Sequence, residues 1–82
     1  MKKKCSKIPI LDINQSAFLK YHDQAPELTA EGTRVVFNHE ATPEVYRLMN
    51  LYNQNPDVKI LDFVHILRRL RAEMLALKGR QK

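Results

Sequence analysis

The 82-residue chain has a single cysteine, two glycines and no long apolar run. Cys5 has no partner for a disulfide within the chain, which favours a reducing cytoplasm over secretion. No apolar run approaches the roughly 20 residues that cross a bilayer. The basic start, MKKKCSKIPILDI, is interrupted by Pro9 and Asp12, so its apolar part is too short for a signal peptide. We therefore expect a cytoplasmic protein with no membrane partner.

Residue types that perform catalysis or bind metals are few and scattered. His22, His39 and His65 lie on different predicted elements, and no pair has the i, i+4 or C-x-x-C spacing of a metal site. Neither Ser6 nor Ser16 belongs to a strand–turn–helix elbow. Two glycines are too few for a Gly-rich phosphate loop. We expect no enzymatic activity, no cofactor, no metal and no small-molecule ligand.

The composition is that of an ordinary globular protein, with 44% hydrophobic and 28% charged residues. Its length allows one small domain. We expect residues 1–8 to form a flexible basic leader, residues 9–78 to form a single domain and residues 79–82 to form a basic tail.

The net charge of +5 is unevenly distributed along the chain. Four lysines and no acidic residue give residues 1–7 a charge of +4. Three basic against seven acidic residues give residues 8–57 a charge of −4, and seven basic against two acidic residues give residues 58–82 a charge of +5. Such a distribution attracts a polyanion to one region while the rest of the surface repels it.

Periodicity predicts an α+β fold in the order α–β–β–α–α. Asp12 is suited to cap a first helix of about three turns, DINQSAFLKYH. A two-stranded hairpin follows, with Gly32 in its turn. In its second arm, TRVVFNHE, Val35 and Phe37 face one way, whereas Pro26 makes the first arm a short edge strand. We expect this hairpin to pack against the helices.

Two further helices complete the predicted domain. Thr42 as N-cap and Pro43 at the first helical position begin a helix that NQNP ends. The last helix is predicted to begin near Leu61 or Asp62. It should bury one apolar stripe, made of Phe63, Ile66, Leu67, Leu70, Met74 and Leu77.

A second apolar strip on the last helix, Val64 and Leu75, lies to the side of the main stripe and needs its own cover. An isolated two-stranded hairpin is also weak. Both features favour a homodimer, in which strand 34–39 or the flank of the last helix meets its copy. Cover by helix 12–22 within one chain is the alternative, and the sequence leaves both open.

Basic residues lie beside this strip. Arg68, Arg71 and Lys78 share one side of the last helix, whereas Arg69 points toward Asp62 and Glu73. Phosphate binding needs only positive charge within reach, so the side can contact a polyanion. The alternative is a solvated helix face whose cations match the C-terminal dipole. No aromatic side chains interleave with the arginines, which argues against a site where the bases of single-stranded nucleic acid stack on the protein.

The segment from Thr33 to Leu75 resembles the ribbon–helix–helix repressors, which are strand–helix–helix dimers that insert a paired ribbon into the major groove. Arg34, Val36 and Asn38 would then face the groove. The predicted helix and hairpin partner before this strand depart from that fold. The acidic Asp57 and Asp62 also depart from that fold, because they lie where its second helix should present its positive end to phosphate.

The stretches DINQSAFL, RVVFNHE and DFVHILRRLR, within residues 12–75, resemble a family of small uncharacterised bacterial domains of unknown function. The resemblance implies an α+β domain of this order and assigns no activity or site residues. It does not extend to MKKKCSK or KGRQK. We therefore expect a small bacterial, non-enzymatic binding module with nucleic acid as its partner. The alternative is a protein-interaction or homodimeric adaptor whose Val64–Leu75 flank docks a partner helix.

Overall fold

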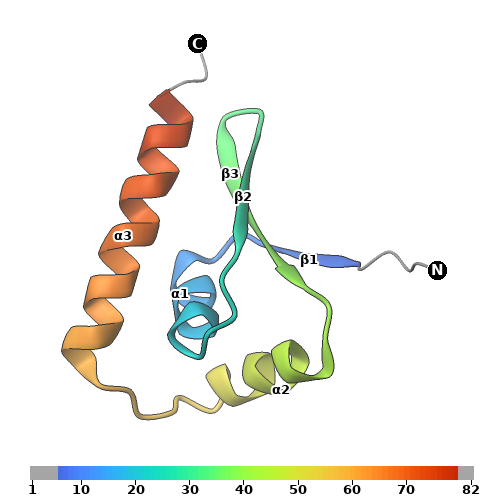
Figure 1. The fold of residues 1–82 in the computed structure, drawn as a ribbon, viewed down its shortest axis with the longest axis vertical. Coiled ribbons are helices and arrows are strands. Elements are labelled where there is room, and N and C mark those ends of the chain that lie inside the picture. The colour runs from blue at the N-terminus through green and yellow to red at the C-terminus, as the bar shows by residue number, and fades with distance from the viewer. Residues whose placement is uncertain (1–5, 80–82) are drawn as a thin grey trace.

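A computed structural model of the chain describes residues 6–79. It confirms the α+β class, and one strand precedes the predicted α–β–β–α–α order (Figure 1). The elements are β1 (Lys7–Ile10), α1 (Ile13–Tyr21), β2 (Glu27–Glu31), β3 (Arg34–Glu40), α2 (Pro43–Tyr52) and α3 (Ile60–Gly79).

The strands form one antiparallel sheet in the order β1-β3-β2. Phe37 at its centre pairs with Ile10 of β1 and Leu28 of β2. The sheet includes residues 7 and 8, which sequence analysis assigned to a flexible leader. Residues 1–5 of that leader and residues 80–82 of the tail lie outside the described residues. β1 was missed because it has four residues and contains Pro9, a residue that is tolerated only on an edge strand.

Strand β3 is the central strand, and its own chain supplies a neighbour on each side. Pairing of the whole strand 34–39 with a copy of itself is blocked, because β2 pairs along residues 34–38 and β1 pairs along residues 37–40 of the other edge. The edge of residues 34–36 opposite β2 has no strand beside it within residues 6–79, and a homodimer stays a prediction. The face assigned to groove contact is also unsuited to that role. Val36 is only 3% exposed, and the Asn38 amide donates to Thr29 Oγ1 at 3.0 Å. Both observations argue against a ribbon–helix–helix arrangement.

The predicted N-caps of the first two helices are confirmed. Asp12 Oδ1 accepts a hydrogen bond from the Asn14 amide at 2.9 Å, and Thr42 Oγ1 accepts one from the Val45 amide at 3.1 Å. Pro43 occupies the first turn of α2, where its missing N–H has no intrahelical partner to lose. These local signals define where the helices begin, because the side chains accept hydrogen bonds from first-turn amides that have no acceptor within the helix.

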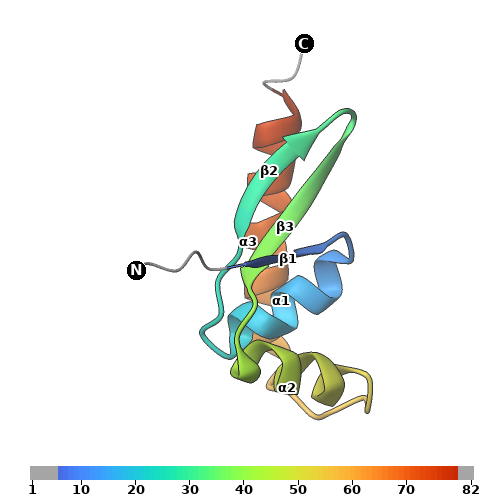
Figure 2. The same cartoon turned by 90° about the vertical axis from the view of Figure 1, so that its right-hand side faces the viewer.

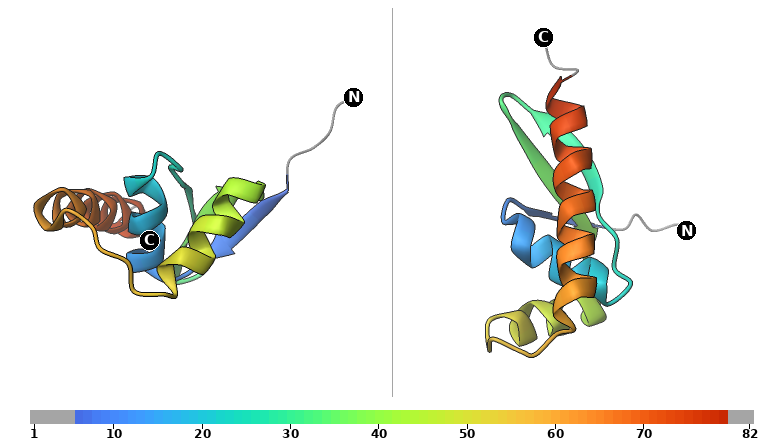
Figure 3. Two further views of the ribbon diagram at one scale, coloured as in Figure 1. Left: turned by 90° about the horizontal axis from the view of Figure 1, so that it is seen from below. Right: turned by 90° about the vertical axis from the view of Figure 1, so that its left-hand side faces the viewer.

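The core lies where α1 meets the sheet and the other two helices. Seen from below, α1 lies between α3 and α2 (Figure 3), and α3 runs alongside the β2–β3 hairpin (Figure 2). Five of the six residues of the predicted α3 stripe are confirmed: Leu70 is fully buried, and Phe63, Ile66, Leu67 and Met74 pack against the core. Leu77, the sixth, is half-buried and is not among the side chains that pack against the core. The other buried core residues are Ile10, Ala17, Phe18, Leu19, Phe37, Val45 and Leu48.

The molecule is flat, with principal extents of 41 × 38 × 17 Å. In α3, Leu70 is the one fully buried residue of twenty. A helix that packs through one stripe leaves the rest of its circumference in solvent. The flank of α3 away from Leu70 is therefore open from Arg68 to Lys78.

Candidate functional site

The candidate site is the outer flank of α3. At 100° per residue, its members fall within an arc of about 80° that is centred roughly 120° from Leu70. We call this surface the α3 flank: Val64, Arg68, Arg71, Leu75 and Lys78. All are exposed except Val64, which is half-buried.

The three cations of the α3 flank are exposed, and within residues 6–79 none of them is in an ion pair. The ion pairs of this part of the chain are Lys7–Glu27 and Arg47–Glu44, both away from α3. Nothing in the described structure therefore neutralises Arg68, Arg71 or Lys78.

Arg69 points elsewhere. It lines a shallow hollow with Asp62 and His65 on the α1 side of the helix. The prediction that it points toward Asp62 fits this position, although no ion pair joins the two side chains in the described structure. Glu73 does not line this hollow and instead lies near Pro26 and Leu28. Arg69 is thus separate from the α3 flank.

The charges of the folded part balance. Residues 6–79 contain nine basic and nine acidic residues, so the excess of +5 comes from Lys2, Lys3, Lys4, Arg80 and Lys82. Affinity of the fold for a polyanion therefore depends on how its charges are arranged. Helix α3 lies at one edge of the molecule, whereas the connection between β3 and α2, which joins Glu40 to Pro43, lies at the opposite side (Figure 1).

A fourth cation joins the flank through tertiary structure. Arg34, at the start of β3, lines a hollow of about 260 Å³ together with Lys78, in the last turn of α3. Gly32 (φ 66°) and Thr33 of the hairpin turn complete its wall. Both cations are exposed, so a phosphate-sized anion can meet them together. Sequence analysis assigned Arg34 only to a ribbon face, because nothing local connects two residues so far apart in the chain.

Leu75 is 56% exposed, so the prediction that helix 12–22 covers it within one chain is wrong. Leu75 stays uncovered because α1 packs on the side of α3 that carries Leu70, and Leu75 lies on a different side of the helix. Val64 is half-buried and is not among the side chains that pack against the core. Of the second apolar strip, Leu75 therefore lies open beside the cations, whereas Val64 is half-buried.

A buried polar pair lies on the other side of α1. Ser16 Oγ and His39 Nε2 are 2.7 Å apart, and both residues are almost completely enclosed. Burial lowers the pKa of His39, with a smaller opposing effect from the Gln24 backbone. A serine beside a histidine is the arrangement of an activated nucleophile, but Ser16 has no exposed surface for a substrate to approach. The pair is structural, and sequence analysis missed it because 23 positions separate its members.

Within residues 6–79, no three histidine, cysteine, aspartate or glutamate side chains gather as metal ligands. No helix of this part is both long and apolar enough to cross a bilayer. Cys5 lies outside the described residues. The chain matches no protein-family model, no curated protein and no solved structure.

Proposed function

We propose that the chain is a small bacterial, cytoplasmic, non-enzymatic binding module that presents the α3 flank to a polyanion, with duplex nucleic acid as the partner. The observation that supports this is the set of three exposed cations, Arg68, Arg71 and Lys78, on one open side of α3 without ion-pair partners. The likeness to bacterial domains of unknown function is compatible with this role and adds no site of its own.

The dimensions of α3 suit this contact. At 1.5 Å per residue, Arg68 and Lys78 are about 15 Å apart along the helix axis. Duplex DNA carries one charge per roughly 1.7 Å of its axis, so several phosphates lie within that span. Arg34 beside Lys78 raises the number of contacts to about four. Each phosphate contact contributes about 0.9 to the slope of log affinity against log salt concentration, which we call the salt slope. For three to four contacts, affinity should therefore fall roughly 40- to 150-fold between 50 and 200 mM salt.

The test is a fluorescence titration of a 20-base-pair duplex, on the order of two helical turns, at several salt concentrations in that range. Arg68→Gln with Arg71→Gln should weaken binding and reduce the salt slope by about 1.8, since two contacts are lost. The matched control is Arg47→Gln with Lys59→Gln, which removes the same charge from exposed positions away from the flank and should leave the slope unchanged. Absence of binding by the wild type at 50 mM salt would refute the proposal.

The basic leader needs a control of its own, because its lysines can attract nucleic acid nonspecifically. Deletion of residues 2–5 removes three lysines and stops before β1, which begins at Lys7. If this deletion abolishes binding while the Arg68 and Arg71 substitutions do not change it, the leader rather than α3 is the binding element.

A second candidate function is an adaptor that docks a partner helix on the α3 flank. It is favoured by Leu75, a large apolar side chain that is 56% exposed on the same surface. Burial of apolar surface drives such a contact, so its affinity changes little with salt, in contrast to phosphate binding. The salt series therefore separates the two functions.

A further inference from the structure

The hollow that joins Arg34 to Lys78 has a shape and a chemistry of its own. It measures about 260 Å³ and is lined by Ala30, Gly32, Thr33, Arg34 and Lys78, and we call it the turn hollow. The turn between β2 and β3 lies beside the C-terminal end of α3 in two perpendicular views (Figure 1 and Figure 2). The turn hollow therefore exists only where these two elements meet in the folded chain.

The side chains of the turn hollow supply hydrogen-bond donors. The guanidinium of Arg34 and the ammonium of Lys78 donate and cannot accept, and the hydroxyl of Thr33 donates as well. Ala30 is apolar, and Gly32 has no side chain that would narrow the hollow. This wall suits a compact group that is rich in acceptor oxygens.

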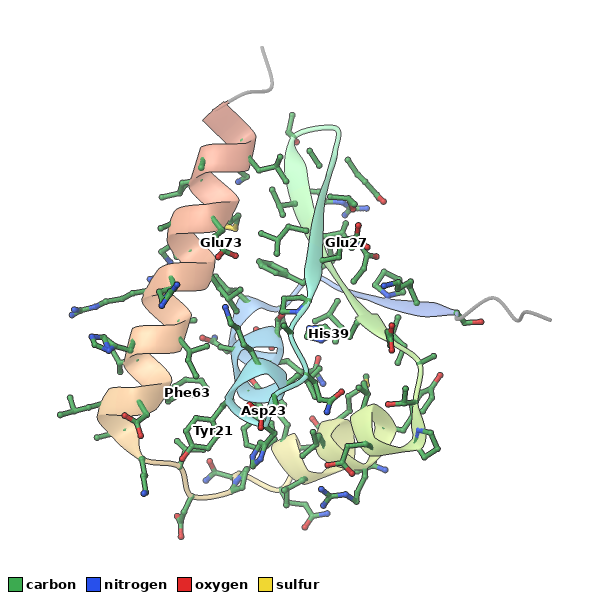
Figure 4. All side chains as sticks on the ribbon, viewed as in Figure 1. Tyr21, Asp23, Glu27, His39, Phe63 and Glu73 are labelled. Carbon is green, nitrogen blue, oxygen red and sulfur yellow. The ribbon has the colours of Figure 1, made fainter. Side chains whose placement is uncertain are left out.

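No carboxylate lines the turn hollow within residues 6–79. Glu31 pairs with Arg34 across the hairpin but forms no ion pair with it in that part of the chain. Glu73 lies beside Leu28, further from the turn (Figure 4). Lys78 by itself matches the negative C-terminal end of α3, but this match does not account for Arg34. Two like charges around one space repel each other, and a bound anion relieves that repulsion.

We propose that the turn hollow binds a phosphate monoester, namely the terminal phosphate of a nucleic acid, an inference that rests on the proposed function. A monoester carries a charge of about −1.5 to −2 at pH 7 and three acceptor oxygens, which match two cations and a hydroxyl. An internal phosphodiester has a single charge and a chain on both sides. A terminal phosphate has one ester link, so it can enter a hollow end-on.

The α3 flank leads to the turn hollow. At 1.5 Å per residue, Arg68 and Arg71 precede Lys78 by about 15 and about 10 Å along the helix axis. A duplex that lies along the flank with its terminal phosphate in the turn hollow thus has internal phosphates within reach of both arginines. The protein should therefore bind the end of a duplex in preference to its interior.

Fluorescence titrations of one duplex in three forms, at about 50 mM salt, test this inference. The forms carry a 5′-hydroxyl, a 5′-phosphate or a 5′-methylphosphate, which is a diester at the same position. The 5′-phosphate should tighten binding about five- to tenfold relative to the hydroxyl, because it adds two charge-assisted contacts at an exposed site. The methylphosphate should give a smaller gain, because it has a single charge.

Variants locate the contact. Arg34→Gln should reduce the gain from the 5′-phosphate to about twofold or less, because one of two cations is lost. Lys59→Gln is the matched control, since it removes the same charge from an exposed position outside the turn hollow and should leave the gain unchanged. Thermal unfolding of both variants checks that they fold.

A second arm separates a nucleic-acid end from a free nucleotide as the source of the phosphate. Adenosine 5′-monophosphate, followed by nuclear magnetic resonance on the full chain, should shift the amides of residues 32–34 and of Lys78 in a saturable manner. Such a shift, without any gain from the 5′-phosphate on the duplex, would assign the turn hollow to a free nucleotide.

Two results would overturn the inference. The first is equal affinity for the three duplex forms together with no saturable shift by adenosine 5′-monophosphate. The second is a gain that Arg34→Gln and Lys59→Gln reduce equally, which indicates attraction by overall charge. In both cases the duplex with a 5′-hydroxyl still binds, so the proposed function stands. A saturable shift by the nucleotide with no binding of any duplex would refute the proposed function alone.

Discussion

Leu70 is the residue through which α3 is most firmly attached to the rest of the fold. It is 0% exposed and belongs to the same core cluster as Phe18, Leu19 and Phe37. Leu70→Ala removes three carbon atoms, worth about 0.8 kcal/mol each in transfer free energy. The cavity left behind adds to this loss, so the free energy of unfolding should fall by about 2–5 kcal/mol.

That loss is a large share of the total stability. A chain of this length is expected to have a free energy of unfolding of about 4–12 kcal/mol. The melting temperature of Leu70→Ala should therefore fall by about 10–30 °C. Thermal and urea unfolding followed by circular dichroism measure both quantities.

Leu75→Ala is the matched control, because it makes the same chemical change on the same helix at a side chain that is 56% exposed. Leucine and alanine have similar helix propensities, so the control should cost less than about 1 kcal/mol. Equal losses of stability for the two variants, or an unchanged melting temperature for Leu70→Ala, would refute the assignment of Leu70 to the core.

Three further predictions concern the buried pair and the flank. Ser16→Ala should cost about 1–3 kcal/mol in urea unfolding, because it leaves His39 Nε2 buried without a partner. Because burial lowers the pKa of His39 below 6.5, the unfolded chain takes up its proton first. Stability should thus be constant above about pH 6.5 and fall below it by up to about 1.4 kcal/mol per pH unit. The control His65→Gln, at an exposed position, should leave the dependence of the urea midpoint on pH unchanged. A wild-type midpoint that does not fall below about pH 6.5 would contradict the assignment of a neutral ring to buried His39. Leu75→Glu should not change the sedimentation mass if the α3 flank meets nucleic acid, whereas conversion of a dimeric wild type into a folded monomer would support the adaptor function.

The exposure of the candidate site follows from local geometry. Arg68, Arg71 and Lys78 lie far around the helix from the buried stripe, and that angle can be computed from the sequence because an α-helix has a fixed rotation per residue. What covers a flank cannot be computed in this way. Leu75 was compatible with an intrachain cover until the position of α1 was known.

The sequence by itself determined the helices, the N-caps of α1 and α2 and most of the buried stripe of α3. Asp12, Thr42 and Pro43 act on amides within one turn, and the stripe repeats every three to four residues, so the information is local. Tertiary structure alone decided the rest. Strand β1 exists because four residues around Pro9 pair with β3, and Arg34 joins Lys78 because the hairpin lies against α3. The Ser16–His39 pair likewise depends on α1 docking onto the sheet. These contacts join residues 23 or more positions apart, and such contacts form only when the whole chain closes around its core.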